Sequence, residues 1–155
     1  MLVPLVEEEI VSKKTSSLLK HQATSTDHQL AEANYLDDHY ICLQPEYEAM
    51  LRYVGMELGW TVLDAGCGGG SYIPLLAETV GVNGRVHAID LAPENIEAVK
   101  ARTEGLSCPV QARVGEIMTM PYADNTFDAL WCANVIQYLT EKELATLLRE
   151  FYRVV

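Results

Sequence analysis

Short β-rich segments alternate with helical segments along most of this chain, and this alternation constrains the fold more than any other feature of the sequence. The β-rich segments cover residues 60–64, 85–90, 109–115 and 127–132, and the helical segments cover residues 71–80, 93–103 and 140–152. Strands that alternate with helices form a parallel sheet that is covered on both faces. The sequence therefore predicts an α/β fold with a doubly wound parallel sheet.

A further helix is predicted ahead of the first strand. Residues 44–58 have helical periodicity, with Pro45 in the first turn, Glu48 and Arg52 as an i,i+4 pair, and Gly59 as the stop. Its expected apolar face consists of Tyr47, Met50, Leu51, Val54 and Leu58.

The last helix has the clearest start signal. Thr140 is followed three residues later by Glu143, which is the spacing of a capping box. Its expected apolar stripe consists of Leu144, Leu147, Leu148 and Phe151.

The chain has the length and apolar content of one globular domain. It has 155 residues, of which 49% are hydrophobic. Its 11 basic and 22 acidic residues give a net charge of −11, which disfavours nucleic acid as a partner because an acidic surface repels phosphates. Residues 1–27 are polar and aperiodic, so we expect a tail there and a domain over residues 28–155.

The sequence lacks the usual signals for a membrane or an oxidising compartment. No apolar run reaches the roughly 18 residues of a membrane helix, and residues 1–10 lack the positive charge of a signal peptide. The four cysteines are widely spaced without a CxxC pair, so we expect neither a metal site nor a dithiol motif. We therefore expect a cytoplasmic protein without a membrane partner, whose thiols are free and buried or partly buried.

The first predicted strand leads into a glycine-rich loop. Residues 62–70 read VLDAGCGGG, with four glycines in five positions. Glycine lets the backbone turn sharply and approach a ligand without a side chain in the way. Because ligands of such sheets bind at the carboxyl ends of the strands, the loop is a candidate cofactor site. The alternative is a turn that needs glycine only for positive φ.

Asp64, at the end of that strand, distinguishes two cofactor classes. A dinucleotide site has the pattern GxGxxG, but after Gly66 and Gly68 this loop has Ser71 in the third position. A carboxylate repels a pyrophosphate and attracts an ammonium or sulfonium group. S-adenosylmethionine carries both cations and no phosphate, so Asp64 favours it over a nicotinamide dinucleotide.

Acidic residues also follow the second and third predicted strands. Asp90 ends the second strand about 20 residues after the glycine loop, where a carboxylate can accept both ribose hydroxyls of either cofactor. Glu116 can accept from an adenine amino group while the Ile117 backbone N–H donates to a ring nitrogen. The alternatives are a solvated turn acid at Asp90 and an ordinary loop acid at Glu116.

Three stretches carry a resemblance to a known family. They are residues 62–70, residues 120–128 (MPYADNTFD) and residues 148–155 (LREFYRVV). In that order they resemble motif I, the LPFPDNSFD stretch before the fourth strand and the helix before the Arg-Pro-Gly-Gly turn of class I S-adenosylmethionine-dependent methyltransferases. The resemblance implies a Rossmann-like fold and methyl transfer to a small-molecule acceptor, as in the ubiquinone- and sterol-type branch.

The resemblance also implies roles for individual residues. Asp64 and the glycine backbone would hold the methionine end, Asp90 the ribose, and Glu116, where the family often has Asp, the adenine. The implied cofactor-binding set is Asp64, Ala65, Gly66, Gly68, Asp90, Leu91, Glu116, Ile117, Asn134 and Tyr40. Gln137 and Tyr138 would lie near the acceptor. A segment with Tyr35, His39 and Tyr40 is expected either to close over the cofactor or to pack.

The family fold has seven strands in the order 3-2-1-4-5-7-6, and this chain supplies four. The fourth strand, with Ala129, Leu130 and Trp131, is then an exposed apolar edge that favours self-association. Our hypothesis is that these 155 residues are a fragment, a truncated product or a half completed by another chain.

The chemistry expected of the chain is limited. Methyl transfer from a sulfonium is an in-line displacement, so the protein mainly aligns and desolvates the reactants. No catalytic base is assigned: His39 and Tyr138 are candidates, whereas His87, in the middle of a strand, is expected to be structural. Two alternatives stay open, a non-catalytic cofactor- or partner-binding chain and a nicotinamide-dependent oxidoreductase.

Overall fold

The computed structural model describes residues 39–155, so the tail predicted over residues 1–27 and the position of Tyr35 lie outside the described residues. The strands are β1 (Thr61–Ala65), β2 (Arg85–Asp90), β3 (Val110–Val114) and β4 (Ala129–Trp131). The helices are α3 (Gln44–Val54), α4 (Ile73–Val80), α5 (Pro93–Arg102) and α6 (Glu141–Val154), with short 3-10 helices η1 (Ile117–Thr119) and η2 (Ile136–Tyr138). The predicted alternation of strands and helices is confirmed.

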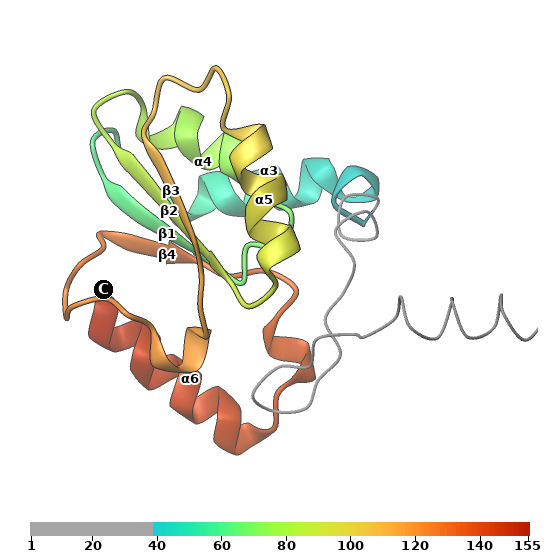
Figure 1. The fold of residues 1–155 in the computed structure, drawn as a ribbon, viewed down its shortest axis with the longest axis vertical. Helices are drawn as coiled ribbons and strands as arrows, with labels where there is room; N and C mark the ends of the chain where they lie inside the picture. The colour runs from blue at the N-terminus through green and yellow to red at the C-terminus, as the bar shows by residue number, and fades with distance from the viewer. Residues whose placement is uncertain (1–38) are drawn as a thin grey trace, which may run out of the picture. The chain divides into compact units, whose positions relative to one another are not determined.

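The four strands form one parallel sheet in the order β3-β2-β1-β4 (Figure 1). Asp64 pairs with Ala88 on one side and with Trp131 on the other. Because all four strands run the same way, the ends of β1, β2 and β3 lie along one edge of the sheet. The doubly wound, Rossmann-like α/β fold is therefore confirmed.

Each face of the sheet has its own hydrophobic cluster. Val62, Val86 and Ala88 belong to the cluster that includes residues of α3, α4 and α5. The other cluster contains Leu63, Ala65, Ile89, Met120, Phe127 and Val154, the last of these from α6. Alternate residues of a strand point to opposite faces, which explains why neighbours such as Val62 and Leu63 belong to different clusters.

Helix α3 ends earlier than predicted. It stops at Val54 because Gly55 adopts the left-handed conformation, with φ of 76°, and its N–H donates to the Arg52 carbonyl. Of the expected apolar face only Tyr47 and Leu51 are buried, while Leu58, beyond the helix, is 79% exposed. The predicted pair of Glu48 with Arg52 is also wrong. Arg52 instead lies 3.9 Å from Glu78 of α4, and Glu48 accepts from Gln44.

Helix α6 has the predicted capping box. The Thr140 backbone N–H donates to Glu143 Oε2 at 2.7 Å, and the Glu143 N–H donates to Thr140 Oγ1 at 3.4 Å. Leu147 of the expected apolar stripe is fully buried, but Leu148 is 53% exposed. No described helix has both the length and the apolar character needed to cross a membrane.

Two expectations about exposure are wrong. Trp131 is only 9% exposed, because it packs in the first cluster, where its ring lies 5.4 Å from that of Tyr72. Within residues 39–155 the backbone of β4 pairs with β1 alone, so β4 is an edge strand. The Trp131 side chain is nevertheless buried, so it does not form the expected exposed apolar surface. Among the free cysteines, Cys42 is exposed rather than buried.

Candidate functional site

The glycine loop after β1 requires glycine for two reasons. Gly66, Gly68 and Gly70 have positive φ angles of 72°, 51° and 84°. A Cβ atom on Gly66 would also lie 2.6 Å from Val135 Cγ2, well inside van der Waals contact. The need for positive φ therefore explains part of the glycine content, and the close approach of Val135 to Gly66 explains another part. The loop places backbone without side chains at the end of β1.

Asp64 is a buried carboxyl with an unused oxygen. The residue is 1% exposed, and Oδ2 has no hydrogen-bond partner among the described residues. Burial, together with the nearby charge of Asp90, raises the pKa of Asp64 to about 8. A cation placed against Oδ2 would compensate the carboxylate charge and supply the missing partner.

Asp90 organises the loop from the end of β2. Its Oδ2 accepts from the Gly68 N–H at 2.9 Å, and its Oδ1 accepts from the Ala92 N–H at 2.9 Å and from Asn95 Nδ2 at 3.0 Å. Asp90 is 7% exposed, so the alternative of a solvated turn acid is wrong. Asn95 was not predicted, although its position in the first turn of α5, close to the end of β2, was a usable signal.

Glu116 lies between β3 and η1 and is the N-cap of η1. Its Oε1 accepts from the Met118 N–H at 3.2 Å and caps the short helix, while Oε2 is buried without a partner among the described residues. The Gly115 N–H donates to the Asp90 carbonyl at 2.9 Å and ties this segment to β2. Capping, as in an ordinary loop acid, accounts for one carboxylate oxygen and leaves the other available to a ligand.

Tyr47 contacts Asn134, His39 and Tyr40, three residues that the sequence analysis proposed for the site independently of one another. Its hydroxyl donates to Asn134 Oδ1 at 3.0 Å and lies 3.4 Å from His39 Nδ1. Asn134 has a φ of 60°, a left-handed conformation that asparagine tolerates. Tyr40 stacks on Tyr47, with ring centroids 6.3 Å apart, and meets Tyr72 edge-on at 5.0 Å. Tyr47 and Tyr72 are therefore additions to the predicted set, and helical periodicity identified Tyr47 only as core.

Several predicted residues lie elsewhere or have packing roles. His87 packs against Tyr122 and Phe127, with ring centroids 5.8 and 5.2 Å away, as the structural interpretation expected. Its pKa is lowered by burial and by the charges of Arg85 and Arg113. The side chain of Ala65 packs in the second cluster and leaves only its backbone for a ligand. The predicted acceptor residues Gln137 and Tyr138 lie in η2, where Tyr138 is 57% exposed, and Leu91 directly follows β2.

Cys67 lies inside the glycine loop but does not have the properties of a nucleophile. It is buried, and burial together with the charges of Asp64 and Asp90 raises the pKa of its thiol. Burial and Asp64 also raise the pKa of Cys132 to about 12. Both shifts favour the protonated thiol near neutral pH, so neither Cys67 in the loop nor Cys132 after β4 has the lowered pKa of a nucleophilic cysteine.

The strand ends thus place three carboxyl groups beside a glycine-rich loop. Asp64 is the penultimate residue of β1, Asp90 is the last residue of β2 and Glu116 follows β3. Two of the three keep a buried oxygen without a partner among the described residues. Such a set attracts a cation and accepts from hydroxyl or amino groups, and it repels a pyrophosphate. The arrangement favours a cationic nucleoside over a dinucleotide.

Comparison with known proteins agrees with this chemistry. Residues 62–155 match a family model described as "Methyltransferase domain". The chain is 35% identical over 98 residues to phosphoethanolamine N-methyltransferase 1 of Triticum aestivum, a match that covers 63% of this chain and 19% of that protein. It is 30% identical over 110 residues to the demethylmenaquinone methyltransferase of Bacillus licheniformis, covering 68% and 47% respectively.

A solved structure has the same architecture. The crystal structure of a SAM-dependent methyltransferase from Aquifex aeolicus superposes with a TM-score of 0.67 at 33% identity, covering 79% of this chain and 65% of that one. The chain spans between 19% and 47% of the lengths of the curated relatives described above.

Proposed function

We propose that this chain, which belongs to the class I S-adenosylmethionine-dependent methyltransferases, binds its cofactor at the ends of β1, β2 and β3 and transfers a methyl group to a small-molecule acceptor. The observation that carries the proposal is the buried Asp64 carboxyl with its unpartnered Oδ2. When Asp64 is ionised, a ligand with a positive charge or a hydrogen-bond donor satisfies that atom, and S-adenosylmethionine has an ammonium group.

The other strand ends fit the rest of the cofactor. Asp90 accepts from the Gly68 N–H through Oδ2, and this oxygen keeps a second lone pair with which to accept from a ribose hydroxyl. Glu116 has its buried Oε2 free to accept from the adenine amino group, and Ile117 follows it with a backbone N–H. Asn134 follows β4, where the resemblance expects the methionine side, and Tyr47 connects it to Tyr40 in the segment before α3.

When bound, S-adenosylmethionine supplies a methyl group that is already activated by the sulfonium. The residues of this chain therefore need to bind and orient the cofactor and the acceptor and to exclude water from them. Asp64 fixes the charged end, and the aromatic cluster of Tyr40, Tyr47, Tyr72 and Trp131 lowers the local water content beside it. We assign no catalytic base, because a base is needed only for acceptors that must lose a proton.

A small molecule is the acceptor class that we propose. The relatives named above act on phosphoethanolamine and demethylmenaquinone according to their names. The net charge of −11 disfavours nucleic acid as the acceptor.

Calorimetric titration of the 155-residue chain with S-adenosylmethionine, with NADH as the control ligand, tests the cofactor. We expect saturable binding of the first and none of the second. Release of S-adenosylhomocysteine in the presence of candidate small-molecule acceptors then tests turnover. Binding of NADH alone would instead support an oxidoreductase, and binding without turnover on any acceptor would support a non-catalytic role.

Asp90→Asn tests the site itself. One amide oxygen cannot replace two carboxylate oxygens, so a donor on Gly68 or Ala92 loses its partner and the loop loses its anchor. We expect S-adenosylmethionine affinity to fall by at least about tenfold, since one lost hydrogen bond to a charged group costs roughly 1.5–3 kcal/mol. Glu94→Gln, at an exposed carboxylate in the same helix turn as Asn95, is the matched control and should leave affinity unchanged.

A further inference from the structure

The last turn of α6 binds the segment that follows η1. Arg153 Nη1 donates to the Tyr122 carbonyl at 2.7 Å and to Asp124 Oδ1 at 2.9 Å, and Nη2 donates to the Met120 carbonyl at 3.1 Å. The backbone continues the contact, because the Asn125 N–H donates to the Arg153 carbonyl at 2.9 Å. One arginine thus holds three successive points of the segment 120–124.

Glu150 completes this contact from one turn earlier in α6. Its Oε1 accepts from the Met120 N–H at 2.7 Å and from Arg153 Nη2 at 2.6 Å, and its Oε2 accepts from Arg153 Nε at 2.8 Å. The Glu150 side chain is 14% exposed and that of Arg153 31%. A two-point carboxylate–guanidinium pair that is this withdrawn from water fixes geometry better than a surface ion pair does.

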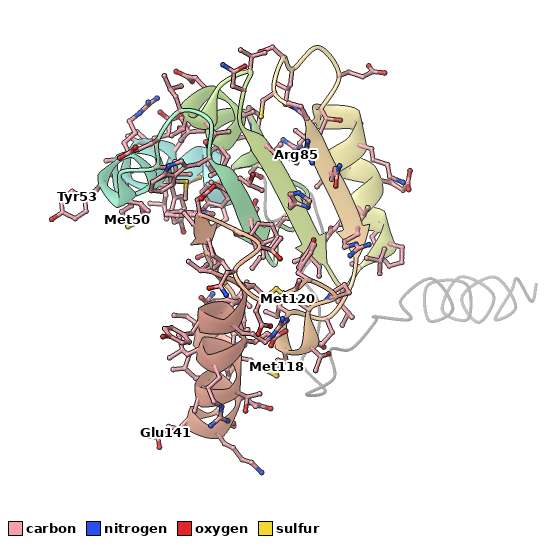
Figure 2. The ribbon with its side chains drawn as sticks, turned by 90° about the vertical axis from the view of Figure 1, so that its left-hand side faces the viewer. Met50, Tyr53, Arg85, Met118, Met120 and Glu141 are labelled. Atoms are coloured by element: carbon pink, nitrogen blue, oxygen red, sulfur yellow. The ribbon has the colours of Figure 1, made fainter. Side chains whose placement is uncertain are left out.

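The segment between β3 and Met120 is consequently held at both ends. The Gly115 N–H is bound by the Asp90 carbonyl at one end, and Met120 is bound by Glu150 and Arg153 at the other. Glu116, with its unpartnered Oε2, lies between these two anchors. In Figure 2, Met120 lies near the end of α6 that is far from Glu141, and Met118 lies beside the same helix, closer to its middle. The direction of the Glu116 carboxylate therefore depends on α6.

We propose that Arg153 and Glu150 are positioning residues that set the selectivity of the cofactor site for adenine. This inference rests on the proposed function, in which Glu116 accepts from the adenine amino group. Arg153 and Glu150 hold the end of the Glu116–Met120 segment, and the segment in turn holds Glu116 Oε2 where that amino group arrives. Neither residue contacts the ligand itself.

The experiment compares the affinities of the chain for S-adenosylhomocysteine and S-inosylhomocysteine by calorimetry. The two ligands differ at position 6 of the base, where an amino group is replaced by an oxygen that repels a carboxylate. We expect the wild-type chain to prefer the adenine ligand by at least about tenfold, since a hydrogen bond to a charged group contributes roughly 1.5–3 kcal/mol. Arg153→Ala should reduce this affinity ratio to less than about threefold, mainly by lowering the affinity for S-adenosylhomocysteine.

Control variants separate positioning from general destabilisation. Arg149→Ala, in the same helix, removes an exposed arginine whose hydrogen bond within residues 39–155 is to Thr146 Oγ1, and it should keep the wild-type ratio. Arg153→Lys keeps the charge without the planar fork and should give an intermediate ratio. Thermal unfolding identifies any variant that fails to fold, and for an unfolded Arg153→Ala the Lys variant becomes the deciding one.

The outcomes distinguish the two proposals. A wild-type chain that binds neither nucleoside overturns the proposed function, and the positioning role with it. A wild-type preference for adenine that persists unchanged in Arg153→Ala and Arg153→Lys overturns the positioning role alone. Equal affinity of the wild type for both ligands overturns the role of Glu116 on which the positioning depends.

Discussion

Asp64 illustrates how one residue can favour ligand binding at the expense of stability. Its carboxyl is removed from water and lies near Asp90, and both effects oppose ionisation and raise the pKa to about 8. The same burial leaves Oδ2 without a partner. In the absence of a ligand, ionisation of Asp64 therefore lowers the stability of the folded chain. When a cation is bound, the same carboxylate attracts it.

The pH dependence of stability follows from this pKa. An unfolded Asp titrates near about 3.9, so between roughly pH 4 and pH 8 the folded chain holds a proton on Asp64 that the unfolded chain has lost. Stability then falls as pH rises through that window, by up to about 1.4 kcal/mol per pH unit. Above the window both states are ionised and this dependence ends.

Asp64→Asn should therefore have opposite effects on stability and on binding. We expect the ligand-free variant to exceed the wild type in free energy of unfolding by more than about 1 kcal/mol at pH 7, with the difference shrinking toward pH 4. S-adenosylmethionine affinity should fall. Denaturant unfolding across this pH range, with the exposed Glu57→Gln as control, measures the first effect. A variant less stable than the wild type at every pH would contradict it.

Helix α6 has a distinct function at each end. Its first turn is closed by the capping box of Thr140 and Glu143, a local device that the sequence shows directly. Its last turn carries Arg153 and Glu150, whose partners lie far earlier in the chain: the Met120 N–H that donates to Glu150 is 30 positions away. The start of α6 is thus stabilised by residues close in sequence, whereas the contacts at its end form only when the folded chain brings the segment 120–124 against it.

Thr140→Ala should destabilise the chain without changing cofactor selectivity. Loss of the cap is expected to lower the free energy of unfolding by about 1 kcal/mol, within a usual range of roughly 0.5–2. Thr146→Ala, which removes a hydroxyl that donates to the Lys142 carbonyl in the middle of the same helix, should change it by less than about 0.5 kcal/mol. Guanidinium unfolding followed by circular dichroism compares the two variants, and equal losses would argue against a specific role of the cap.

At the scale of the whole molecule, the sheet has two cores and an unpaired edge at β4. The two hydrophobic clusters cover opposite faces, and the proposed site lies at the carboxyl ends of the strands. Within the described residues β4 pairs only with β1. An unpaired backbone edge can add a strand from a second copy of the chain, and we expect self-association by this route.

Ala129→Pro is designed to block that association. The Asp128 N–H donates to the Thr61 carbonyl, so the next N–H, that of Ala129, points away from β1. Proline there removes an outward donor and leaves the ladder with β1 intact. Sedimentation velocity should show a coefficient that rises with concentration for the wild type and stays constant for a variant that circular dichroism shows to be folded. A wild type that is monomeric at every concentration would refute the association.

The sequence by itself determined the features that depend on neighbours along the chain. The alternation of strands and helices, the glycine loop and the α6 capping box are of this kind, because backbone periodicity, positive φ and a reach of three residues are local properties. The acids at the ends of β1 and β2 were predicted for the same reason, since a parallel sheet brings strand ends to one edge.

Only the tertiary structure decided which atoms are left without partners and which distant residues meet. Tyr47 donates to Asn134 across 87 positions of sequence, and burial leaves Asp64 Oδ2 without a partner. Helix α3 ends at Val54 and is capped by Gly55 rather than Gly59, although both glycines have positive φ, 76° and 88°. These outcomes depend on packing between segments that are distant in sequence. The packing energy is the sum of many such contacts, and a local sequence pattern cannot predict them.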